Sequence, residues 1–374
     1  MKKNNSIGFR TTWAEVDLSC LDFNFKQVRR VTQGKSGIMA VIKCDAYGHG
    51  MLPIAERLIR LGVDYFGVAS LDEAVILRKN KVKTPILVLG NVSAPDAGAV
   101  VDFALTQTVS GYELAGKLNQ AAGKKGKSAR VHIKVDTGMG RLGILYKHAF
   151  AFIKQAVRMK HLRVEGMFTH FPCADSDPGF TNHQISIFNK LVNDLKKAGI
   201  QIPLLHTANS MGIIGYPRSH FNLVRPGLML YGIHPKPGLN IRLKPVLALK
   251  SRIIYLKRIP RGQGISYGRT YFTKRESSIA VFPIGYGDGY PRNLSNRAEV
   301  LIRGRRFRIS GTVCMDQIMV DLGDLSVKTG NEAVLIGRQG KESISAEELS
   351  RLSRTIPYEI VCGIGSRVAR LYIN

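Results

Sequence analysis

Short apolar runs alternate with longer amphipathic stretches between residues 37 and 232. The runs have the length of buried strands, and the stretches between them repeat apolar residues at helical spacing. This alternation predicts a parallel sheet, and eight units within about 200 residues favour a closed (β/α)8 barrel of the TIM type over an open doubly wound sheet. The predicted strands are 37–42, 65–69, 86–89, 105–109, 129–135, 164–168, 202–205 and 222–224, with helices at 52–61, 71–79, 112–122, 147–159 and 182–198.

The pattern changes after Lys244-Pro245. Apolar, β-branched runs separated by glycine-rich turns follow, which is typical of antiparallel strands. These runs are 246–259, 277–284, 298–302, 307–312, 318–322 and 332–336, and one short helix is expected at 345–353. We therefore predict a barrel domain over 11–245 and a mostly antiparallel β domain over 246–374, to which residues 1–10 are added.

Composition places the chain among globular proteins and excludes several classes. The apolar fraction is 44% and the mean hydropathy is −0.03, which argues against disorder, and no apolar run is long enough to span a membrane. The first ten residues lack the apolar core of a secretion signal, so we expect a cytoplasmic protein. The cysteines do not form any Cys-x-x-Cys pair, which predicts reduced thiols and no metal site; they are Cys20, Cys44, Cys173, Cys314 and Cys362.

A formal charge of +28 and an isoelectric point near 10.1 would suit a nucleic-acid-binding protein. The densest basic runs, 79–83, 124–127 and 303–308, are far apart and carry no repeated aromatic residues. We therefore interpret the charge as a dispersed basic surface and expect no nucleic-acid partner. Salt-dependent binding to duplex DNA would identify the alternative.

Polar residues gather at the predicted carboxyl ends of the barrel strands, where (β/α)8 barrels place their chemistry. Singly, each has an ordinary packing role, but burying so many ionisable groups together would be costly without a function. Loops after the seventh and eighth strands commonly hold phosphate, and here they offer the Ser210 hydroxyl and the amides of Gly227 and Leu228. The rim residues are Lys43, Lys134, Asp136, His170, His206, Asn209, Ser210 and Arg225.

The first strand ends in Lys43, and Tyr47 follows on a glycine-flanked turn. A primary amine at a strand end can form a Schiff base, and a phenol on such a turn can donate to a phosphate. Together they suggest pyridoxal phosphate. The alternative for this segment alone is a lysine with a buried stem beside a packed tyrosine.

One motif favours another cofactor. Residues 138–143 read Gly-Met-Gly-Arg-Leu-Gly, which matches the dinucleotide pattern G-x-G-x-x-G. The match is weak, because the preceding strand belongs to the fifth unit and ends in Lys134-Val135-Asp136. We therefore disfavour nicotinamide or flavin and interpret Arg141 as a side chain directed over the barrel mouth.

Several segments of the sequence resemble those of a known enzyme family. The segment 40–50, Ala-Val-Ile-Lys-Cys-Asp-Ala-Tyr-Gly-His-Gly, is similar to the cofactor-lysine signature of bacterial alanine racemases. Seven further segments resemble the same family in order along nearly the whole chain: 134–143, 168–171, 206–210, 224–227, 265–268, 284–289 and 313–317. The resemblance implies an N-terminal barrel and a C-terminal β domain, in agreement with the hydrophobic pattern.

The resemblance implies a racemase with two bases. Lys43 would bind pyridoxal phosphate and serve one face of the substrate α-carbon, and Tyr267 would serve the opposite face. Both groups need pKa values below about 10 for this work. In the family the opposing tyrosine comes from the second subunit and is linked through the residue matching His170 to the one matching Arg225, so a homodimer with a shared site is expected.

The remaining roles also follow from the resemblance. Arg225 would face the pyridine nitrogen and disfavour its protonation, which argues against a decarboxylase or transaminase. Arg141 would contact the cofactor and the substrate carboxylate, and Lys134 matches a lysine that is often carbamylated. Substrate contacts are expected from Met315, Asp316 and Tyr286, and cofactor contacts from Tyr47, His170, Asn209, Ser210, Gly227 and Leu228.

The predicted activity is interconversion of L-alanine and D-alanine, which supplies D-alanine for peptidoglycan. One departure concerns Ser366, where some relatives have a tyrosine that limits the pocket. The smaller serine would leave a roomier pocket. A serine racemase or one of broad specificity is the alternative, because one or two pocket residues decide which side chain fits and a methylene contributes only about 1–3 kcal/mol of discrimination.

Overall fold

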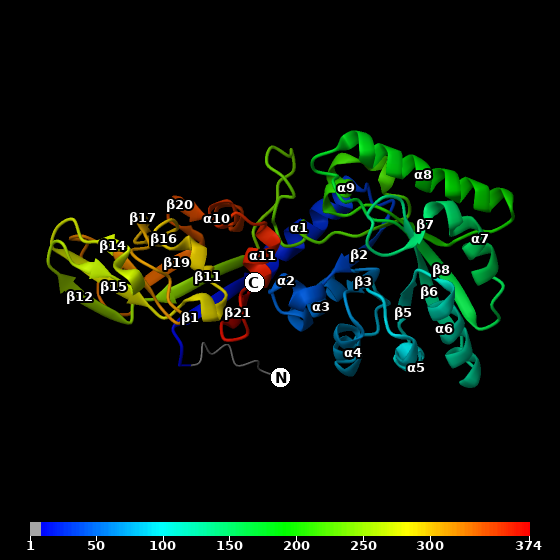
Figure 1. Ribbon diagram of the computed structural model, residues 1–374, viewed down its shortest axis with the longest axis horizontal. Coiled ribbons are helices and arrows are strands. Elements are labelled where there is room, and N and C mark those ends of the chain that lie inside the picture. The colour runs from blue at the N-terminus through cyan, green and yellow to red at the C-terminus, as the bar shows by residue number, and fades with distance from the viewer. Residues whose placement is uncertain (1–8) are drawn as a thin grey trace.

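The computed structural model describes residues 9–374, which form two domains along one long axis (Figure 1). The first is a parallel sheet in the order β10-β2-β3-β4-β5-β6-β8-β9, and it confirms the predicted barrel. Each predicted barrel strand is found within a few residues of its expected bounds. The strands are β2 (Gly37–Val41), β3 (Tyr65–Val68), β4 (Ile86–Val88), β5 (Thr106–Val109), β6 (Ala129–Asp136), β8 (Leu162–Phe168), β9 (Leu204–His206) and β10 (Leu223–Val224), and the short β7 (Ile144–Leu145) pairs with β6.

The barrel is nearly closed, and a side chain completes its seam. Among the described residues β9 and β10 form no ladder pair. Instead the Asn222 amide accepts a hydrogen bond from Leu205 N at 2.8 Å and donates to Pro203 O at 2.6 Å. One backbone bond, from Arg225 N to Ala208 O at 2.9 Å, follows at the carboxyl end of the seam. An asparagine side chain thus replaces the missing backbone ladder.

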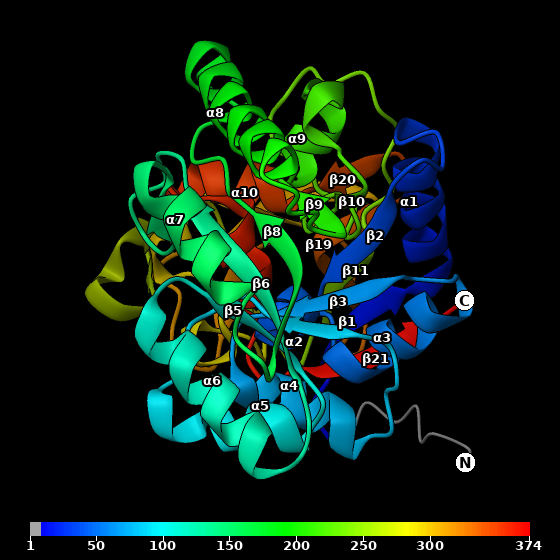
Figure 2. The ribbon, with the colours of Figure 1, turned by 90° about the vertical axis from the view of Figure 1, so that its right-hand side faces the viewer.

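Helices surround the barrel strands, as Figure 2 shows. Their starts follow local rules: in α4, Ser70 and Glu73 form a reciprocal capping box. The predicted helices are all present. The helices of this domain are α1 (Leu18–Val31), α3 (Met51–Arg60), α4 (Leu71–Lys79), α5 (Ala97–Asp102), α6 (Tyr112–Lys124), α7 (Tyr146–Ala156), α8 (Pro178–Lys197) and α9 (Ser210–Gly215), with short 3-10 turns at Ala94–Asp96 and Pro217–Ser219.

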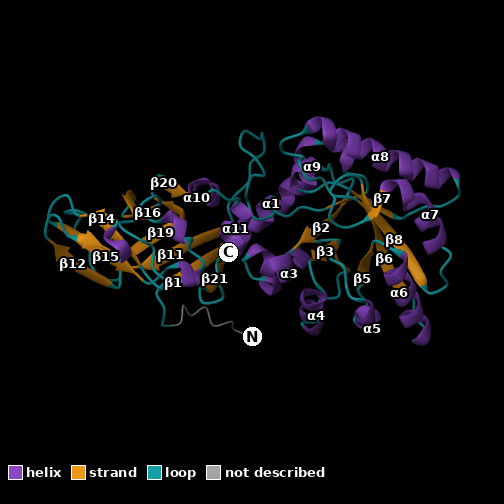
Figure 3. Cartoon of the chain, viewed as in Figure 1, coloured by secondary structure: helices purple, strands orange, loops and turns teal. Residues whose placement is uncertain are grey.

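The second domain is mostly antiparallel, as predicted. Its main sheet has the order β17-β16-β19-β11-β1-β21, and smaller sheets join β12, β15 and β18, and β13 with β14 (Figure 3). The predicted run 246–259 is divided into two strands that lie in different sheets. The elements are β11 (Leu247–Arg252), β12 (Tyr255–Ile259), β13 (Gly264–Ile265), β14 (Tyr271–Phe272), β15 (Ser277–Phe282), β16 (Glu299–Ile302), β17 (Arg305–Arg308), β18 (Ile318–Asp321), β19 (Glu332–Gln339), β20 (Glu342–Ile344), α10 (Ala346–Ser353), α11 (Pro357–Cys362) and β21 (Ala369–Ile373).

The domain boundary differs from the predicted one. Strand β1 (Thr12–Asp17), which the sequence assigned to the barrel, pairs antiparallel with β11 and parallel with β21 in the second sheet. Backbone pairing therefore places it in the β domain, and Asp17 then caps α1 by accepting from Ser19 N and Cys20 N. The prediction for residues 1–8 lies outside the described residues.

Three further properties concern the described chain as a whole. All five cysteines are free. Residues 9–374 contain no group of His, Cys, Asp or Glu side chains arranged to hold a metal ion. None of the helices in that range has the length and apolar character needed to cross a membrane.

Candidate active site

The chain makes a left-handed turn immediately after β2, where Lys43 begins the segment α2 (Lys43–Tyr47). Cys44, Asp45, Ala46 and Tyr47 have φ angles from 51° to 56°. This conformation costs roughly 1–2 kcal/mol for each residue with a side chain. The surrounding structure must therefore hold the turn that presents the lysine.

Contacts from both domains hold this turn. Cys44 N donates to Glu73 Oε1 at 2.6 Å. At Gly48, an added Cβ would lie 2.2 Å from Val361 O, so α11 packs directly against the turn and requires glycine there. Arg370 Nε also donates to Gly48 O at 3.0 Å. The last part of the β domain thus supports the turn that carries the predicted cofactor lysine.

Tyr47 is buried beside the predicted phosphate loop. An added Cβ at Gly227 would lie 2.6 Å from the Tyr47 hydroxyl, so only glycine allows this approach. The Tyr47 ring lies 4.8 Å from that of Tyr231 and 5.7 Å from that of Tyr358. Burial raises the pKa of Tyr47 above its ordinary value, which keeps its phenol protonated as a donor.

The loops after β9 and β10 meet at Ser210. Its hydroxyl accepts from Gly227 N at 3.0 Å and from Met229 N at 3.2 Å. Leu228 lies between them and is buried. Asn209 has a local role, because its side chain caps α9 by accepting from Gly212 N at 2.9 Å. Hydroxyl and amides thus converge at the predicted phosphate position.

Arg225 is fully buried and is held by the backbone of neighbouring strands. Its guanidinium donates to His206 O at 2.7 Å, Thr169 O at 2.7 Å and Thr207 O at 3.0 Å. It also lies 2.9 Å from His206 Nδ1. Burial lowers the pKa of Arg225 to about 9, but these acceptors orient it as a cationic donor at neutral pH.

Arg225, His206 and His132 are joined by hydrogen bonds whose donors and acceptors can be assigned. A guanidinium only donates, so His206 Nδ1 accepts and the His206 proton lies on Nε2. That nitrogen is 2.8 Å from His132 Nδ1, which leaves the His132 proton on Nε2, where it has no partner among the described residues. Burial, followed by the charge of Arg225, lowers the pKa of His132 to about 3. Both rings are therefore neutral.

Lys134 and His170 share this cationic environment. Burial, with the charges of Arg225 and Arg141, lowers the pKa of Lys134 well below its usual value. The Lys134 ammonium position lies 4.4 Å from the centre of the Phe168 ring. Burial and the same cations lower the pKa of His170. The mouth thus favours neutral amine and imidazole groups beside fixed guanidinium charges.

The glycine-rich loop that carries Arg141 is organised by a carboxylate. Asp136 Oδ1 accepts from the amides of Gly138 and Met139, each at 2.8 Å, and from Gly140 N at 3.2 Å. In a dinucleotide site such amides would face a phosphate. Here the amides donate to Asp136 of the same chain. This supports the interpretation that the loop positions Arg141 rather than binding a phosphate.

Four predicted residues lie in the second domain, and we call them the loop cluster: Tyr267, Tyr286, Met315 and Asp316. The Tyr267 side chain is 71% exposed, and Met315 is 53% exposed. Backbone bonds join the loops, since Tyr286 N donates to Cys314 O at 3.0 Å. Asp316 pairs with Arg367 at 2.6 Å. The loops are thus fixed by their backbone, while the side chains predicted to act in the site are largely exposed.

The structure therefore divides the predicted site into two groups. Around the barrel mouth it brings together Lys43, Tyr47, Lys134, Arg141, His170, Asn209, Ser210, Arg225, Gly227 and Leu228. The loop cluster projects from the other domain, whose strands β12 to β15 lie at the opposite end of the long axis from the barrel (Figure 1). Ser366 is exposed.

Sequence reasoning missed two neighbours of the site. His132 could have been found, because it stands two residues before Lys134 on β6 and so shares its face of the strand. Tyr358 has no such signal, since its contact with Tyr47 joins distant parts of the chain. Burial raises the pKa of Tyr358 to about 12.

Comparison with known proteins agrees with this arrangement. The model of the alanine racemase N-terminal domain matches residues 16–235, and that of the C-terminal domain matches residues 246–372. The chain belongs to the alanine racemase family. The alanine racemase of Halothermothrix orenii is 47% identical, and the match spans 98% of this chain and 97% of the relative. The alanine racemase of Symbiobacterium thermophilum is 45% identical, and the match spans 98% of each chain.

Solved alanine racemase structures have the same fold. The enzyme of Clostridium difficile 630 superposes with a TM-score of 0.92 at 37% identity, and the match spans 97% of this chain and 96% of that enzyme. The Bacillus anthracis alanine racemase with bound L-Ala-P has a TM-score of 0.92 at 36% identity, and the match spans 99% of this chain and 96% of that enzyme. Membership of the alanine racemase family thus extends across both domains.

Proposed function

We propose that this protein interconverts L-alanine and D-alanine with pyridoxal phosphate, and so supplies D-alanine for peptidoglycan. One observation carries the proposal. Lys43, on a supported left-handed turn, and the buried cation Arg225 both lie at the same barrel mouth. A carboxylate in place of Arg225 would favour other reactions of this cofactor.

The residues of the barrel mouth fit the cofactor. Lys43 would bind its aldehyde carbon, and Arg225 would donate to its ring nitrogen. Tyr47, Ser210, Gly227 and Leu228 would hold the phosphate, where the close approach of Gly227 to Tyr47 leaves no room for a Cβ. Once bound, pyridoxal phosphate supplies an electron sink that acidifies the substrate α-hydrogen.

The chain's own groups would move the proton. The Lys43 Nζ serves one face of the substrate α-carbon, and the Tyr267 hydroxyl serves the other. Because Tyr267 is mostly exposed on the second domain, we propose that Tyr267 of the partner subunit completes each site. The active form is then a homodimer, in which His170, whose pKa is lowered by burial and by Arg225, would connect the two halves.

Substrate contacts would come from both halves of the site. Arg141 and the Met315 amide bind the substrate carboxylate, with Asp316 and Tyr286 at the entrance. Lys134, an amine whose pKa is lowered by burial and by the charges of Arg225 and Arg141, is suited to carbamylation, in which the neutral amine adds CO2 and releases a proton. The resulting anion would pair with Arg141 and orient it.

The test is a direct assay of racemisation. Purified protein loaded with pyridoxal phosphate is incubated with L-alanine and, in parallel, with L-serine, and the D-isomers are separated by chiral chromatography. We expect D-alanine to form much faster. Faster formation of D-serine would favour the alternative, a serine or broad-specificity racemase, for which the small Ser366 is the supporting observation. Formation of neither isomer would refute the proposal.

A further inference from the structure

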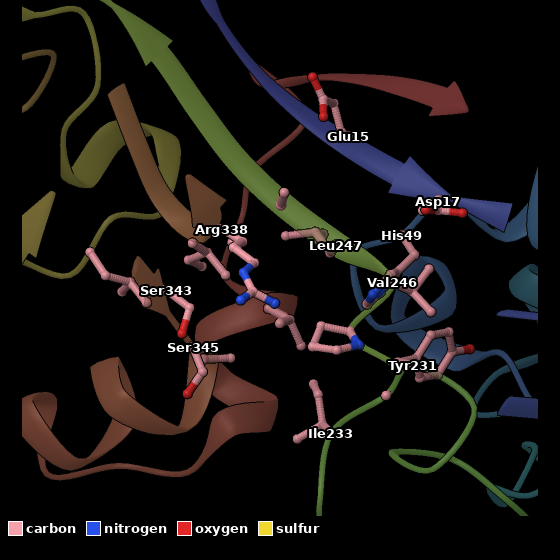
Figure 4. A pocket seen from close by; sticks show the side chains of 18 of the residues that line it. Glu15, Asp17, His49, Tyr231, Ile233, Val246, Leu247, Arg338, Ser343 and Ser345 are labelled. Atoms are coloured by element: carbon pink, nitrogen blue, oxygen red, sulfur yellow. The ribbon is translucent and has the colours of Figure 1, made fainter. Parts of the chain in front are cut away.

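A cavity of about 420 Å³ lies between the two domains. His49 and Tyr231 border it from the barrel side, and Arg338 and Ser343 from the β domain, with Leu247 of β11 between the two groups (Figure 4). The residues proposed above to bind cofactor or substrate do not line it. Its volume falls within the range of small-molecule sites.

His49 lines this cavity and carries an acceptor that nothing in the described chain uses. The ring is fully buried, and its Nδ1 lies 3.0 Å from Ala46 O and 2.9 Å from Tyr47 O. Carbonyl oxygens only accept, so Nδ1 carries the proton and Nε2 is a bare lone pair. Burial lowers the pKa of His49 to about 4, which keeps the ring neutral. Nε2 has no partner among the described residues, so a ligand here must bring an N–H or O–H group.

The opposite wall offers a cation and a hydroxyl. Arg338 on β19 and Ser343 on β20 are direct cross-strand partners, so both side chains leave the same face of the hairpin. Arg338 Nε donates to Gly340 O at 3.1 Å. Among residues 9–374 no carboxylate forms an ion pair with it. This end of the cavity is suited to a carboxylate group.

Carboxylates elsewhere on the wall favour a positively charged donor on the ligand. Glu15 accepts from Lys250 at 2.8 Å, Asp17 caps α1, and Glu347 Oε1 accepts from His234 N at 3.3 Å. Lys250 offsets the charge of Glu15. Asp17 and Glu347 form no ion pair within residues 9–374, so their charge stabilises an amine over a second acid.

We propose that this cavity is a second ligand site for a short zwitterionic peptide. Its carboxylate binds Arg338 and Ser343, its small apolar side chains fill the middle, and its amine donates to His49 Nε2. Because His49 Nδ1 holds the carbonyls of Ala46 and Tyr47, the ligand stands directly behind the left-handed turn that presents Lys43. Occupancy is therefore coupled to that turn, and this regulatory part rests on the proposed function.

The only tryptophan of the chain provides the binding signal. Trp13 is buried, and its Nε1 donates at 3.0 Å to Glu15, which lines the cavity. The holoenzyme is titrated with L-alanyl-L-alanine and with D-alanyl-D-alanine, with tryptophan emission and calorimetry as readouts. We expect binding in the millimolar range or tighter. Propanoyl-L-alanine, which lacks the amine, should bind about tenfold more weakly.

Variants locate the binding. Arg338→Met should weaken peptide binding about tenfold or more, and Ser343→Tyr, which fills the cavity, should abolish it. Arg351→Met, an exposed arginine on α10 outside the lining, should bind as the original protein does. Equal affinity in Arg338→Met, or no binding of either peptide, would overturn the site. A structure at saturating peptide that shows only a water on His49 Nε2 would do the same.

The two proposals fail separately. Peptide binding in a protein that does not racemise alanine would leave the cavity site standing and refute the racemase function. In an active enzyme, peptide binding that leaves KM and kcat for alanine unchanged would overturn the coupling to the Lys43 turn.

Discussion

The barrel mouth and the loop cluster are both polar, but they differ in how completely one chain fixes them. In the barrel, Arg225 donates to three backbone carbonyls, and the lysine turn is supported from two domains. In the loop cluster, the backbone is bonded while Tyr267, Tyr286 and Met315 expose much of their side chains. A buried charge is costly unless it is hydrogen-bonded, and here the same chain supplies all three acceptors. An exposed phenol has no such cost and can remain without a protein partner until a second subunit binds.

The difference suggests a division of labour. The barrel holds the groups whose pKa values depend on burial and on fixed neighbouring charges. Under the proposed function, the loop cluster would supply groups that act only when the partner subunit covers them. Breaking either half should therefore produce a different defect, and the variants below separate the two.

The largest effect is expected in the barrel. Lys43→Ala removes the amine that would bind the cofactor and move a proton, so racemisation should fall by more than about 1,000-fold and the visible absorbance of the bound cofactor should be lost. Absorption spectra and the chiral assay measure the two losses together. Lys43→Arg keeps the charge and should fail equally, whereas an active, coloured Lys43→Ala protein would contradict the assignment.

Removing one hydroxyl from the loop cluster should give a different defect. Tyr267→Phe should slow racemisation by roughly 10²–10⁴-fold while cofactor absorbance stays unchanged. Exchange of the α-hydrogen with solvent deuterium, followed by NMR, should fall more for one enantiomer than for the other. Tyr255→Phe, an exposed tyrosine of the same domain, is the matched control. Equal small losses for both enantiomers would refute the two-base mechanism.

Mixing the two inactive variants tests whether the site is shared. In hybrid dimers of Lys43→Ala and Tyr267→Phe subunits, one of the two sites regains both groups if Tyr267 serves the partner subunit. Random exchange should then restore up to about a quarter of the original activity. If both groups act within one chain, neither site is complete and the mixture stays inactive.

A smaller effect is expected inside the barrel at Lys134. If carbamylation orients Arg141, Lys134→Ala should reduce kcat/KM roughly tenfold, mainly through a higher KM. With ¹³C-bicarbonate, NMR should show a carbamate signal that is absent from the variant. A missing signal in the original protein at neutral pH would contradict the modification.

The smallest effect concerns stability in acid. Unfolded histidines have a pKa near 6.5, whereas His49 and His132 have folded values of about 4 and about 3. Between these limits the unfolded state binds more protons, so stability should fall as the pH drops from about 6.5 and the loss should level off below about 3. Urea midpoints across this range measure the slope. His132→Gln should flatten it, while exposed His148→Gln should not; an unchanged slope in His132→Gln would contradict the account.

Much of the fold could be predicted because it depends on local patterns. The barrel strands follow from apolar runs, and the helices from spacing and caps such as Ser70 with Glu73. Residues 12–17 were included in the predicted barrel range without being recognised as a strand, and only the pairing of β1 with β11 and β21 assigns them to the second sheet. The seam at Asn222 depends on a tertiary contact that no local pattern reports.

The site shows the same limit. Strand ends indicated Lys43, Lys134 and Arg225, since parallel strands deliver their last residues to one rim. Nothing in the composition of residues 44–47 predicts a left-handed turn, because none is glycine and tertiary contacts stabilise it. Contact of Asn209 with the cofactor stays a prediction, and the structure adds that its side chain caps α9.

The support of that turn has a consequence for how the enzyme can be assembled. Arg370 donates to Gly48 O across 322 positions of the chain, and Val361 packs on the same glycine. During synthesis the lysine leaves the ribosome long before the residues that hold its turn. A nascent barrel therefore lacks the contacts that hold the Lys43 turn until α11 and β21 of the second domain have been made.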